Sequence, residues 1–524
     1  MSEWIEPPDR FPVPVTAYGP LHLLARRAYE LATGGHTPEA IRAAEAYLTI
    51  AEAVDDQRTI AFLQQAKMYA FLYGGRIDDA TAVGELLLAT HRRTGNVVAE
   101  AKVLCDLAQM RVLQTRYVDG MRYLARAGML LDLCPRSERH RSAMCSFAHA
   151  AAVAQMYETA ADAYERLTAQ DGDSSRTTTF DLVYSRTLLY WGVRLDHVGR
   201  FDEAATRLRR TAAITRRWLD QHPGDPCMTA VQALALAKLG DTAVAEKLAE
   251  SAIMPLREGE SWEFARMAHL ALGISRRASG RLSESRREFL AAHQLCDFSA
   301  PHPDERPIIR YEMGLTAVAL DGGQPSRDLF AAVANQVREL WQLRLQRVGM
   351  LRQARQREEV EAARADAEQE SRRDALTGLG NRRRFDLLLG QVDAGELGRP
   401  LTLLLVDLDH FKAVNDAYSH SAGDRVLREV ATLLVSHCRP GDEAVRYAGD
   451  EFVLFLRGDA AHGRDVAERI RQSVARAEIL AGVRLTVSVG MAELTDGMTA
   501  EALFRAVDDR LYAAKWSGRN TIAA

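Results

Sequence analysis

A short pattern that recurs through the N-terminal part of the chain constrains the fold most. In each copy a small or turn residue and a polar residue precede an apolar or small residue, an acid and usually Ala or Ser. The copies are GHTPEA, GRIDDA, TRYVDG, QMYETA, GRFDEA, GDTAVA and GRLSES, which begin at Gly35, Gly75, Thr115, Gln155, Gly199, Gly240 and Gly280. Successive copies begin 40 to 44 residues apart, and a nearly fixed period of this size indicates stacked helix pairs. Because one pair cannot bury its apolar stripe alone, about seven pairs should stack into a curved superhelix with a concave face.

The residues that carry this pattern are rich in Ala, Leu and Arg, and their apolar residues recur at helical spacing. The segment GRFDEAATRLRRTAAI, which begins at Gly199, resembles the turn and second helix of a tetratricopeptide repeat (TPR). The period exceeds the roughly 34 residues of that repeat, so longer helices are expected. We predict a TPR-like all-α domain over residues 20–326, after a flexible Pro-rich tail at residues 1–19. The resemblance implies a protein or peptide ligand, with a scaffold or dimerisation surface as the alternative.

Composition and charge exclude several classes of protein. Hydrophobic residues make up 47% of the chain and charged residues 26%, which excludes bulk disorder. The net charge of −4 gives no electrostatic reason to expect nucleic acid or an anionic membrane as a partner. No apolar run approaches the roughly 18 residues of a membrane span, and the N-terminus does not resemble a signal peptide. The six cysteines form no CxxC pair, so we predict free thiols and a cytoplasmic protein.

A long helical stalk is predicted over residues 327–373, which contain one glycine, Gly349, and no proline. A helix over these 47 residues would span about 70 Å. Its first half has apolar residues at roughly coiled-coil spacing, namely Val333, Val337, Leu340, Trp341, Leu345, Val348 and Leu351. Its second half is polar, with pairs such as Glu368 and Arg372 at i,i+4 spacing. We interpret the helix as a dimer stalk, although a merely solvated helix is the alternative for the polar half.

The segment RYAGDEFVLF, Arg446 to Phe455, predicts a β-hairpin. Alternating apolar residues precede the turn and a β-rich run follows it. The tight turn carries two adjacent carboxylates, Asp450 and Glu451. Such a turn can hold a hard cation, and a plain hairpin is the alternative for these ten residues taken alone.

A second segment, LTLLLVDLDHFK, places more acid near that turn. Leu401–Val406 is a short apolar run typical of a buried strand, and it is followed by Asp407 and Asp409. Carboxylates at the end of a buried strand, near a second acidic turn, suit Mg²⁺ with few protein ligands and substrate phosphate as the remainder. Lys412 follows and could meet phosphate as a point charge.

Five motifs now occur in order: DALTGLGNRR, VDLDHFKAVNDAYSHSAGD, RYAGDEF, VSVGMAE and AAKWSGRN. Together they resemble the GGDEF domain of diguanylate cyclases, over residues 374–524. Ala448 departs from the family, which usually has its first Gly there, and Ala is the smallest possible change. The resemblance implies a palm-like α/β fold, shared with nucleotidyl cyclases and polymerases, with a mainly antiparallel sheet. Strands are predicted at Leu401–Val406, Ala444–Tyr447, Phe452–Leu456 and Arg484–Val489, and helices at Ser421–His437, Arg464–Ile479 and Thr499–Trp516.

The resemblance implies that two GTP molecules are condensed to cyclic di-GMP and two pyrophosphates. Each ribose 3′-hydroxyl would attack the α-phosphate of the other GTP. Two Mg²⁺ (or Mn²⁺) ions per active site would lower the hydroxyl pKa and neutralise the departing pyrophosphate. The implied metal ligands are the carboxylates of Asp407 and Asp450 and the carbonyl of Leu408.

The resemblance also assigns catalytic and substrate-binding roles. Asp450 would act as general base, Glu451 would support the site, and Lys412 would stabilise charge on the transferring phosphoryl group. Lys515 and Arg519 would hold the β- and γ-phosphates, with Gly449 also among the substrate-binding residues.

Asn415 and Asp424 match the family's guanine-reading pair. A carboxylate can accept from guanine N1–H and N2–H together, which adenine cannot offer, so GTP is expected over ATP. The alternative for Asp424 is an N-cap of the following helix. Arg439 and Asp442, in RPGD, match the RxxD site at which the family binds its product, cyclic di-GMP; a plain Pro-Gly turn is the alternative.

One GGDEF domain presents one GTP, so the reaction implies a homodimer. Our hypothesis is that the repeats sense a ligand, that the stalk sets the pose of two catalytic domains, and that bound product locks an unproductive pose. Two alternatives are a catalytically inactive receptor for cyclic di-GMP and a TPR-type adaptor whose C-terminal domain is structural.

Overall fold

The computed structural model describes residues 21–34, 36–169, 180–298, 302–480 and 482–524. The chain divides into two compact units, residues 1–359 and 360–524, which are described separately below. The predicted Pro-rich tail at residues 1–19, and Gly35 of the first repeat copy, lie outside the described residues. None of the helices in the described ranges combines the length and apolarity that a membrane span requires.

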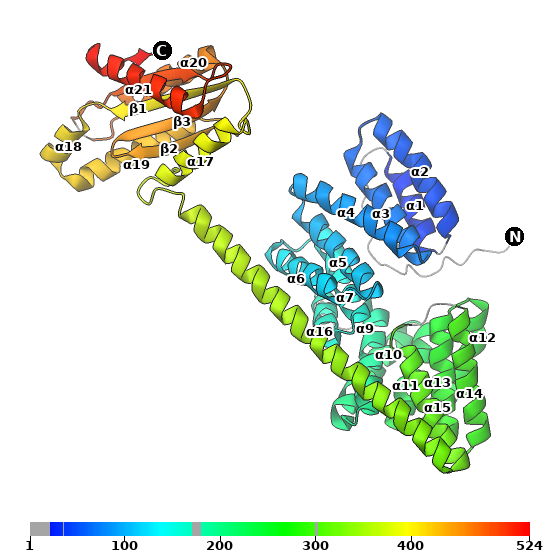
Figure 1. Ribbon diagram of the computed structural model, residues 1–524. Helices are drawn as coiled ribbons and strands as arrows, with labels where there is room; N and C mark the ends of the chain where they lie inside the picture. The colour runs from blue at the N-terminus through cyan, green and yellow to red at the C-terminus, as the bar shows by residue number, and fades with distance from the viewer. Residues whose placement is uncertain (1–20, 35, 170–179, 299–301, 481) are drawn as a thin grey trace. The chain divides into compact units, whose positions relative to one another are not determined.

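The first unit is the predicted stack of helix pairs (Figure 1). The first helices of the pairs are α1 (His22–Thr33), α3 (Gln57–Tyr73), α5 (Val97–Leu113), α7 (Glu138–Val153), α9 (Phe180–His197), α11 (Pro226–Leu239) and α13 (Trp262–Ala278). The second helices are α2 (Thr37–Ala53), α4 (Ile77–Arg93), α6 (Tyr117–Leu133), α8 (Tyr157–Ala169), α10 (Phe201–Gln221), α12 (Thr242–Glu258) and α14 (Leu282–Gln294). A short 3₁₀ turn, η1 (Leu295–Asp297), and α15 (Glu305–Asp321) follow.

The recurring sequence pattern is the turn inside each pair. The second helix of each pair begins two residues after the start of a copy of the pattern. The starting residue is left-handed in each described copy, with φ of 76° at Gly75 and 62° at Gln155. This conformation ends a helix by returning N–H groups to its last carbonyls, as Arg76 N does to Phe71 O at 2.8 Å. Glycine adopts it without strain, which is why most copies begin with Gly.

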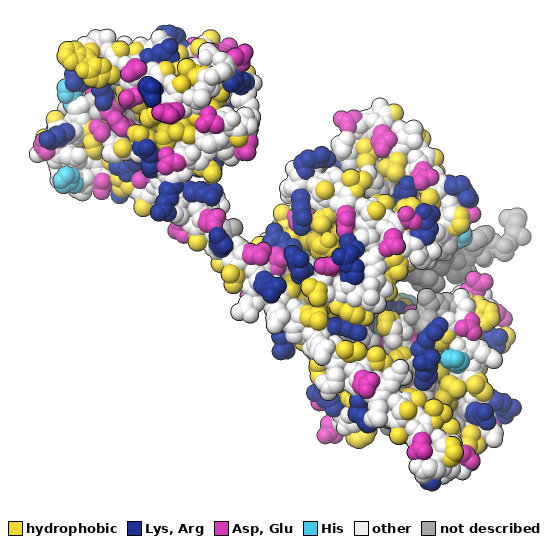
Figure 2. All heavy atoms as spheres, viewed as in Figure 1, with side chains coloured by type: hydrophobic (Ala, Val, Ile, Leu, Met, Phe, Trp, Pro, Cys, Tyr) yellow, Lys and Arg dark blue, Asp and Glu magenta, His cyan; other side chains and the backbone are white. Residues whose placement is uncertain are grey.

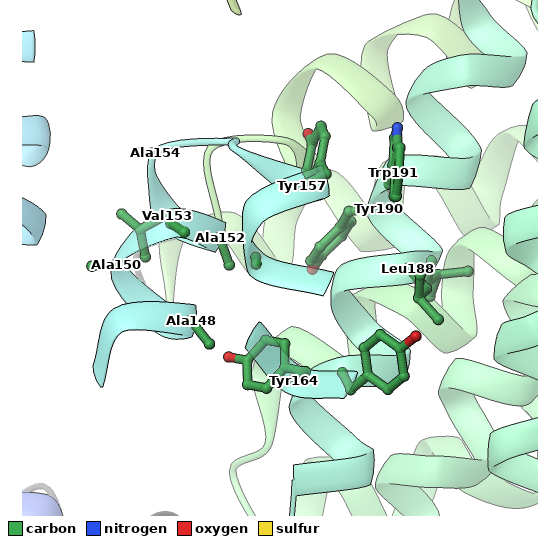
Figure 3. Packing of buried hydrophobic residues seen from close by; sticks show 14 of the residues in the cluster. Ala148, Ala150, Ala152, Val153, Ala154, Tyr157, Tyr164, Leu188, Tyr190 and Trp191 are labelled. Atoms are coloured by element: carbon green, nitrogen blue, oxygen red, sulfur yellow. The ribbon is translucent and has the colours of Figure 1, made fainter. Parts of the chain in front are cut away.

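Aromatic and small residues fill the interior of the stack. In Figure 3, Tyr157, Tyr190 and Trp191 lie beside one another, to one side of alanines of α7 such as Ala152. The rings of Tyr157 and Trp191 stack with centroids 6.2 Å apart. Small residues set the approach of neighbouring helices: a Cβ on Gly273 would lie 2.5 Å from the Phe289 ring. The cysteines are all free, and three of them are buried in this unit, as the sequence predicted.

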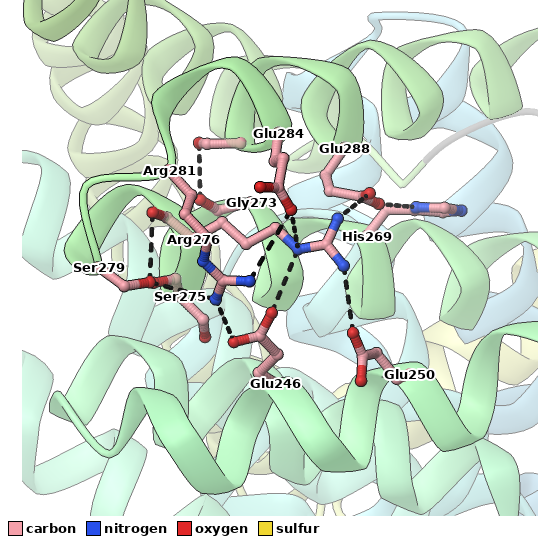
Figure 4. A network of polar contacts seen from close by, with 11 residues as sticks. Glu246, Glu250, His269, Gly273, Ser275, Arg276, Ser279, Arg281, Glu284 and Glu288 are labelled. Atoms are coloured by element: carbon pink, nitrogen blue, oxygen red, sulfur yellow. Dashed lines mark hydrogen bonds and ion pairs between the residues drawn. The ribbon is translucent and has the colours of Figure 1, made fainter.

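A polar network joins α12, α13 and α14 at the surface of the stack (Figure 4). The guanidinium of Arg276 donates to Glu246 at 3.2 Å, to Glu250 at 3.1 Å and to Glu288 at 2.6 Å. Its side chain is only 16% exposed, so the carboxylates around it depend on its charge.

The predicted long helix is α16 (Gln324–Glu370). It follows Gly322, whose left-handed φ of 61° ends α15. Val337 and Trp341 are buried, and Trp341 belongs to the apolar cluster of the repeats. The first half of α16 therefore packs on the repeats of its own chain, whereas Leu345 stays 41% exposed. Part of the apolar stripe that suggested a dimer seam is covered within the monomer, and dimerisation itself stays a prediction.

The second unit contains a five-stranded sheet in the order β2-β3-β1-β4-β5. Its strands are β1 (Leu401–Leu408), β2 (Glu443–Ala448), β3 (Glu451–Arg457), β4 (Val487–Glu493) and β5 (Ile522–Ala523). Strand β1 pairs antiparallel with β3 and β4, and β5 pairs parallel with β4. The predicted hairpin is confirmed as β2–β3, with a register shift between Arg446 and Ala448.

Helices cover both faces of this sheet (Figure 1). They are α17 (Arg382–Asp393), α18 (Phe411–Tyr418), α19 (His420–Ser436), α20 (Ala460–Arg476) and α21 (Ala500–Trp516). Alternate residues of β1 enter two cores: Leu404 and Val406 face the side of α19 and α20, and Leu403 and Leu405 face α17 and α21. This period of two explains why the whole strand is apolar.

Some predicted boundaries were wrong. The strand predicted at Arg484–Val489 is β4, which begins at Val487 and continues to Glu493. Helix α20 begins four residues earlier than predicted because Asp459 caps it through His462 N. The sequence predictions did not include α17, α18 or β5.

Candidate active site

The predicted acidic site forms where β1 ends beside the β2–β3 turn. Asp407 lies opposite Glu451 in the β1–β3 register. The N–H of Leu408 donates to the carbonyl of Asp450 at 3.3 Å. The turn holds this pose because Gly449 is left-handed, with φ of 46°. The structure thus brings Asp407, Leu408, Asp450 and Glu451 to one place, and their roles stay predictions.

The electrostatics of the site favour a cation. Burial raises the pKa of Asp407, and the neighbouring carboxylates of Asp450 and Asp409 raise it further, while Lys515 opposes them. Burial likewise raises the pKa of Glu451, with Asp407 the next contribution. When neighbouring carboxylates raise one another's pKa, a cation placed between them stabilises their ionised forms.

The donor set fits a divalent cation with few protein ligands. Within the described ranges, no group of three or more His, Cys, Asp or Glu side chains is placed to hold a metal ion. Asp407 and Asp450 offer hard carboxylate oxygens, and Leu408 adds a carbonyl at the end of β1. Mg²⁺ is bound in this way when substrate phosphates complete its coordination.

Two basic residues come from the C-terminal end of the domain. Lys515, in the last turn of α21, lies with Nζ 2.7 Å from Asp407 Oδ2. Arg519 follows in a left-handed turn with φ of 63°. Lys412 is exposed on α18. Lys515 is therefore the cation in direct contact with the acidic site.

The predicted guanine-reading residues lie on neighbouring helices. A Cβ on Gly423 would stand 1.9 Å from Asn415 Oδ1, so the amide of Asn415 packs directly on α19 beside Asp424. Helix α19 begins at His420 after Ser419. The N-cap alternative for Asp424 is therefore wrong, because Asp424 lies inside the helix and its carboxylate is not a cap.

Arg439 and Asp442 occupy the turn between α19 and β2. Asp442 Oδ2 accepts from Arg439 N at 2.8 Å, and Asp442 Oδ1 accepts from Arg457 N at 2.9 Å. The carboxylate thus shapes the turn, while the Arg439 side chain is exposed. The structure supports the turn interpretation for Asp442 and leaves the Arg439 guanidinium accessible.

Asp374 begins the DALTGLG motif, and no role was predicted for it from the sequence. Arg446 Nη1 donates to Asp374 Oδ1 at 3.2 Å, and Arg446 Nε donates to the carbonyl of Gly449 at 2.9 Å. Burial opposes ionisation of Asp374, but hydrogen bonds from Thr377 and Arg446 outweigh it and lower its pKa. Asp374 and Arg446 therefore brace the acidic turn. The sequence signal that could have indicated this role is an Asp followed three residues later by Thr, a spacing typical of a turn capped by the Asp side chain.

Comparison with known proteins finds matches for the C-terminal part of the chain. Residues 371–521 match the family model described as "Diguanylate cyclase, GGDEF domain". The diguanylate cyclase DgcM of Escherichia coli is 44% identical over 154 residues, which are 29% of this chain and 38% of DgcM. The response regulator PleD of Caulobacter vibrioides is 40% identical over 160 residues, which are 28% of this chain and 35% of PleD.

A crystal structure of the coiled coil and GGDEF domain of DgcB from Caulobacter crescentus, in complex with c-di-GMP, was also found. It is 34% identical, covers 33% of this chain and 97% of that chain, and has a TM-score of 0.30. The matched region is less than two fifths of the length of DgcM or PleD. The C-terminal domain of this chain is therefore a GGDEF domain, and the comparisons with DgcM and PleD rest on that domain.

Proposed function

We propose that this protein is a diguanylate cyclase that condenses two GTP into cyclic di-GMP and two pyrophosphates. The observation that carries the proposal is the meeting of Asp407 with the Asp450–Glu451 turn, with Lys515 Nζ 2.7 Å from Asp407. Asp407, Asp450 and the Leu408 carbonyl would hold Mg²⁺ or Mn²⁺, two ions per site. When bound, such ions lower the pKa of a hydroxyl nucleophile and neutralise a departing pyrophosphate.

The side chains around this site divide the remaining work. The carboxylate of Asp424 accepts from guanine N1–H and N2–H, and Asn415 lies beside it. Lys515 and Arg519 hold the β- and γ-phosphates, and Lys412 meets the transferring phosphoryl group. Asp450 accepts the proton of the ribose 3′-hydroxyl, and Glu451 keeps the acidic turn in place.

We propose a homodimer as the catalytic form, because one domain presents one nucleotide. The first half of α16 leaves Leu343, Leu345 and Met350 exposed, at 47%, 41% and 36%, so an apolar surface for a second copy is available. We propose a cytoplasmic location for this dimer, which the free thiols and the proposed GTP substrate support.

Product inhibition through Arg439 is also proposed. Its guanidinium is exposed on a turn whose backbone is fixed by Asp442. A planar guanidinium in a fixed place can pair with a phosphate or guanine edge of cyclic di-GMP. Asp442 acts in this proposal by shaping the turn.

Control by the repeats is proposed from the docking of α16. Arg344 is 2% exposed and donates to the carbonyl of Gln155 at 2.9 Å. It also pairs with Glu158, and its guanidinium lies 4.9 Å from the Tyr157 ring. A ligand that alters the turn at Gln155 would alter the contact between this turn and α16. The C-terminal residues of α16 belong to the catalytic unit. A protein or peptide is the class of ligand that such an array offers a surface to.

Incubation of the purified protein with GTP and Mg²⁺, followed by mass analysis, tests the proposal. Cyclic di-GMP is expected, at a rate per molecule that rises with protein concentration because two copies must meet. A protein that binds cyclic di-GMP but leaves GTP unchanged at every concentration would instead be a receptor. Binding of protein partners without either nucleotide effect would indicate an adaptor.

A further inference from the structure

Asp409 lies two residues beyond Asp407 but has a different environment. It is 4% exposed. Its Oδ1 accepts from Ser488 Oγ at 2.7 Å, and its Oδ2 accepts from Thr486 Oγ1 at 2.7 Å. A third bond comes from the backbone N–H of Asn520, at 3.0 Å from Oδ2. Because both of its oxygens accept hydrogen bonds from other residues of the domain, this carboxylate has a structural role.

The Asn520 bond fixes a turn that is costly to form. After α21 ends at Trp516, the chain passes through three left-handed residues: Gly518 at 108°, Arg519 at 63° and Asn520 at 48°. Glycine and, less readily, asparagine tolerate this conformation, but an arginine is strained there. Such a turn persists only when its surroundings hold it.

The same turn carries a basic residue of the proposed phosphate site. Arg519 precedes Asn520 directly, and Arg519 N returns to the carbonyl of Ala514 at 3.3 Å, beside Lys515. Beyond the turn, Val489 N donates to the carbonyl of Thr521 at 2.9 Å, where the chain joins β4. Asp409 thus ties the Lys515–Arg519 segment to the end of β1, where Asp407 lies.

We propose that Asp409 is a positioning residue for triphosphate binding: it holds the Gly518–Asn520 turn so that Arg519 and Lys515 face the nucleotide phosphates. The inference rests on the proposed function. It separates two adjacent acids of one motif, since Asp407 would meet the metal while Asp409 holds the basic residues that meet the phosphates.

The chemistry of the site predicts different effects for two substitutions. Asp409→Ala removes both acceptor oxygens, and with them all three hydrogen bonds, and frees the turn. Asp409→Asn keeps a carbonyl oxygen for Asn520 N–H, and its amide N–H₂ can donate to Ser488, whose hydroxyl can accept as well as donate. A misplacement of about 1 Å in a positioned group costs about 100-fold in rate, so a loss of that order in kcat/KM is expected for Asp409→Ala and a loss under about tenfold for Asp409→Asn.

The experiment measures binding of GMP and of a GTP analogue with a methylene bridge between the α- and β-phosphates, by calorimetry on the full chain with Mg²⁺. Wild type should prefer the triphosphate. Asp409→Ala should lose that preference while its GMP affinity stays within about threefold, and Asp409→Asn should regain most of it. Thr486→Val is the matched control, since it removes one donor to Asp409 but leaves the Asn520 bond, and its preference should match wild type.

Equal losses of GMP and triphosphate affinity in Asp409→Ala would overturn the inference, because they would indicate a general structural role. Failure of Asp409→Asn to restore the preference would overturn it as well. If Asp409→Ala does not fold, Asp409→Ser replaces it with the same expected outcomes, since its hydroxyl is too short to reach Asn520. A wild type that binds neither nucleotide and forms no cyclic di-GMP would instead refute the proposed function.

Discussion

Substitution of Arg344 by Met should release α16 from the repeats. The hydrogen bond from this charged donor to Gln155 O, at 2.9 Å, contributes about 1.5–3 kcal/mol. The ion pair with Glu158, whose side chain is 54% exposed, adds at most about 1 kcal/mol. Stacking over Tyr157 of the repeats, at 4.9 Å, adds roughly 0.5–1 kcal/mol. Met preserves the buried chain length, so a net loss of about 3 kcal/mol in docking is expected.

Hydrogen exchange measures this loss directly. Since every 1.4 kcal/mol corresponds to a factor of ten, amides of α16 between Val337 and Leu351 should exchange about a hundredfold faster in Arg344→Met. Arg355→Met is the matched control on the same helix. Its ion pair with Asp132 joins side chains that are 56% and 44% exposed, so its loss should stay under about 1 kcal/mol. Equal exchange in the two variants would refute the assignment of Arg344 as the main anchor, and an unchanged GTP turnover in Arg344→Met would contradict control through α16.

Three further predictions concern the catalytic unit and the repeats. Asp450→Asn should lower cyclic di-GMP formation by about 10²–10⁴-fold, measured by chromatography, while its melting temperature stays near that of wild type. Arg439→Ala should keep the initial rate but abolish the slowing caused by added cyclic di-GMP; a retained slowing would contradict the product site. Burial, aided by Lys238, lowers the pKa of His197 to about 4. Stability from the neutral ring is therefore complete above the unfolded-state pKa of about 6.5 and is lost, by about 3 kcal/mol, as pH falls towards 4. Denaturant titrations of His197→Phe should show a flatter dependence over this interval.

Local sequence patterns correctly predicted the turns of the repeats and strand β1 of the sheet. The left-handed turn residue and the following acid have a local physical cause, so every described copy of the pattern coincides with a turn between paired helices. The apolar run at Leu401 gave β1 because both faces of that strand are buried. The sequence did not show that Thr486, inside the strand predicted at Arg484–Val489, donates to Asp409, which lies in a distant part of the chain.

The surroundings of individual charged residues could not be predicted. An apolar stripe at coiled-coil spacing also fits a helix laid along an array, and only the fold shows that Val337 and Trp341 face the repeats. Arg344 resembles its many exposed neighbours in sequence, yet it is buried. Asp424 follows a glycine, as a cap might, but the helix had already begun at His420.

The turn at Gln155 shows that the repeats are not interchangeable modules. Most copies have Gly at this position, whereas Gln155 adopts φ of 62°, and its side chain joins Asp304 at 2.7 Å and Arg347 at 2.8 Å. A consensus sequence of the copies would replace Gln155 by Gly. This substitution would relieve the backbone strain at this residue and remove both side-chain hydrogen bonds. The substituted chain would keep the backbone carbonyl that accepts from Arg344, but the buried carboxylate of Asp304 would lose one hydrogen-bond donor and Arg347 its acceptor. A consensus residue at this position would therefore relieve one strained residue and weaken the contacts that distinguish this repeat from the others.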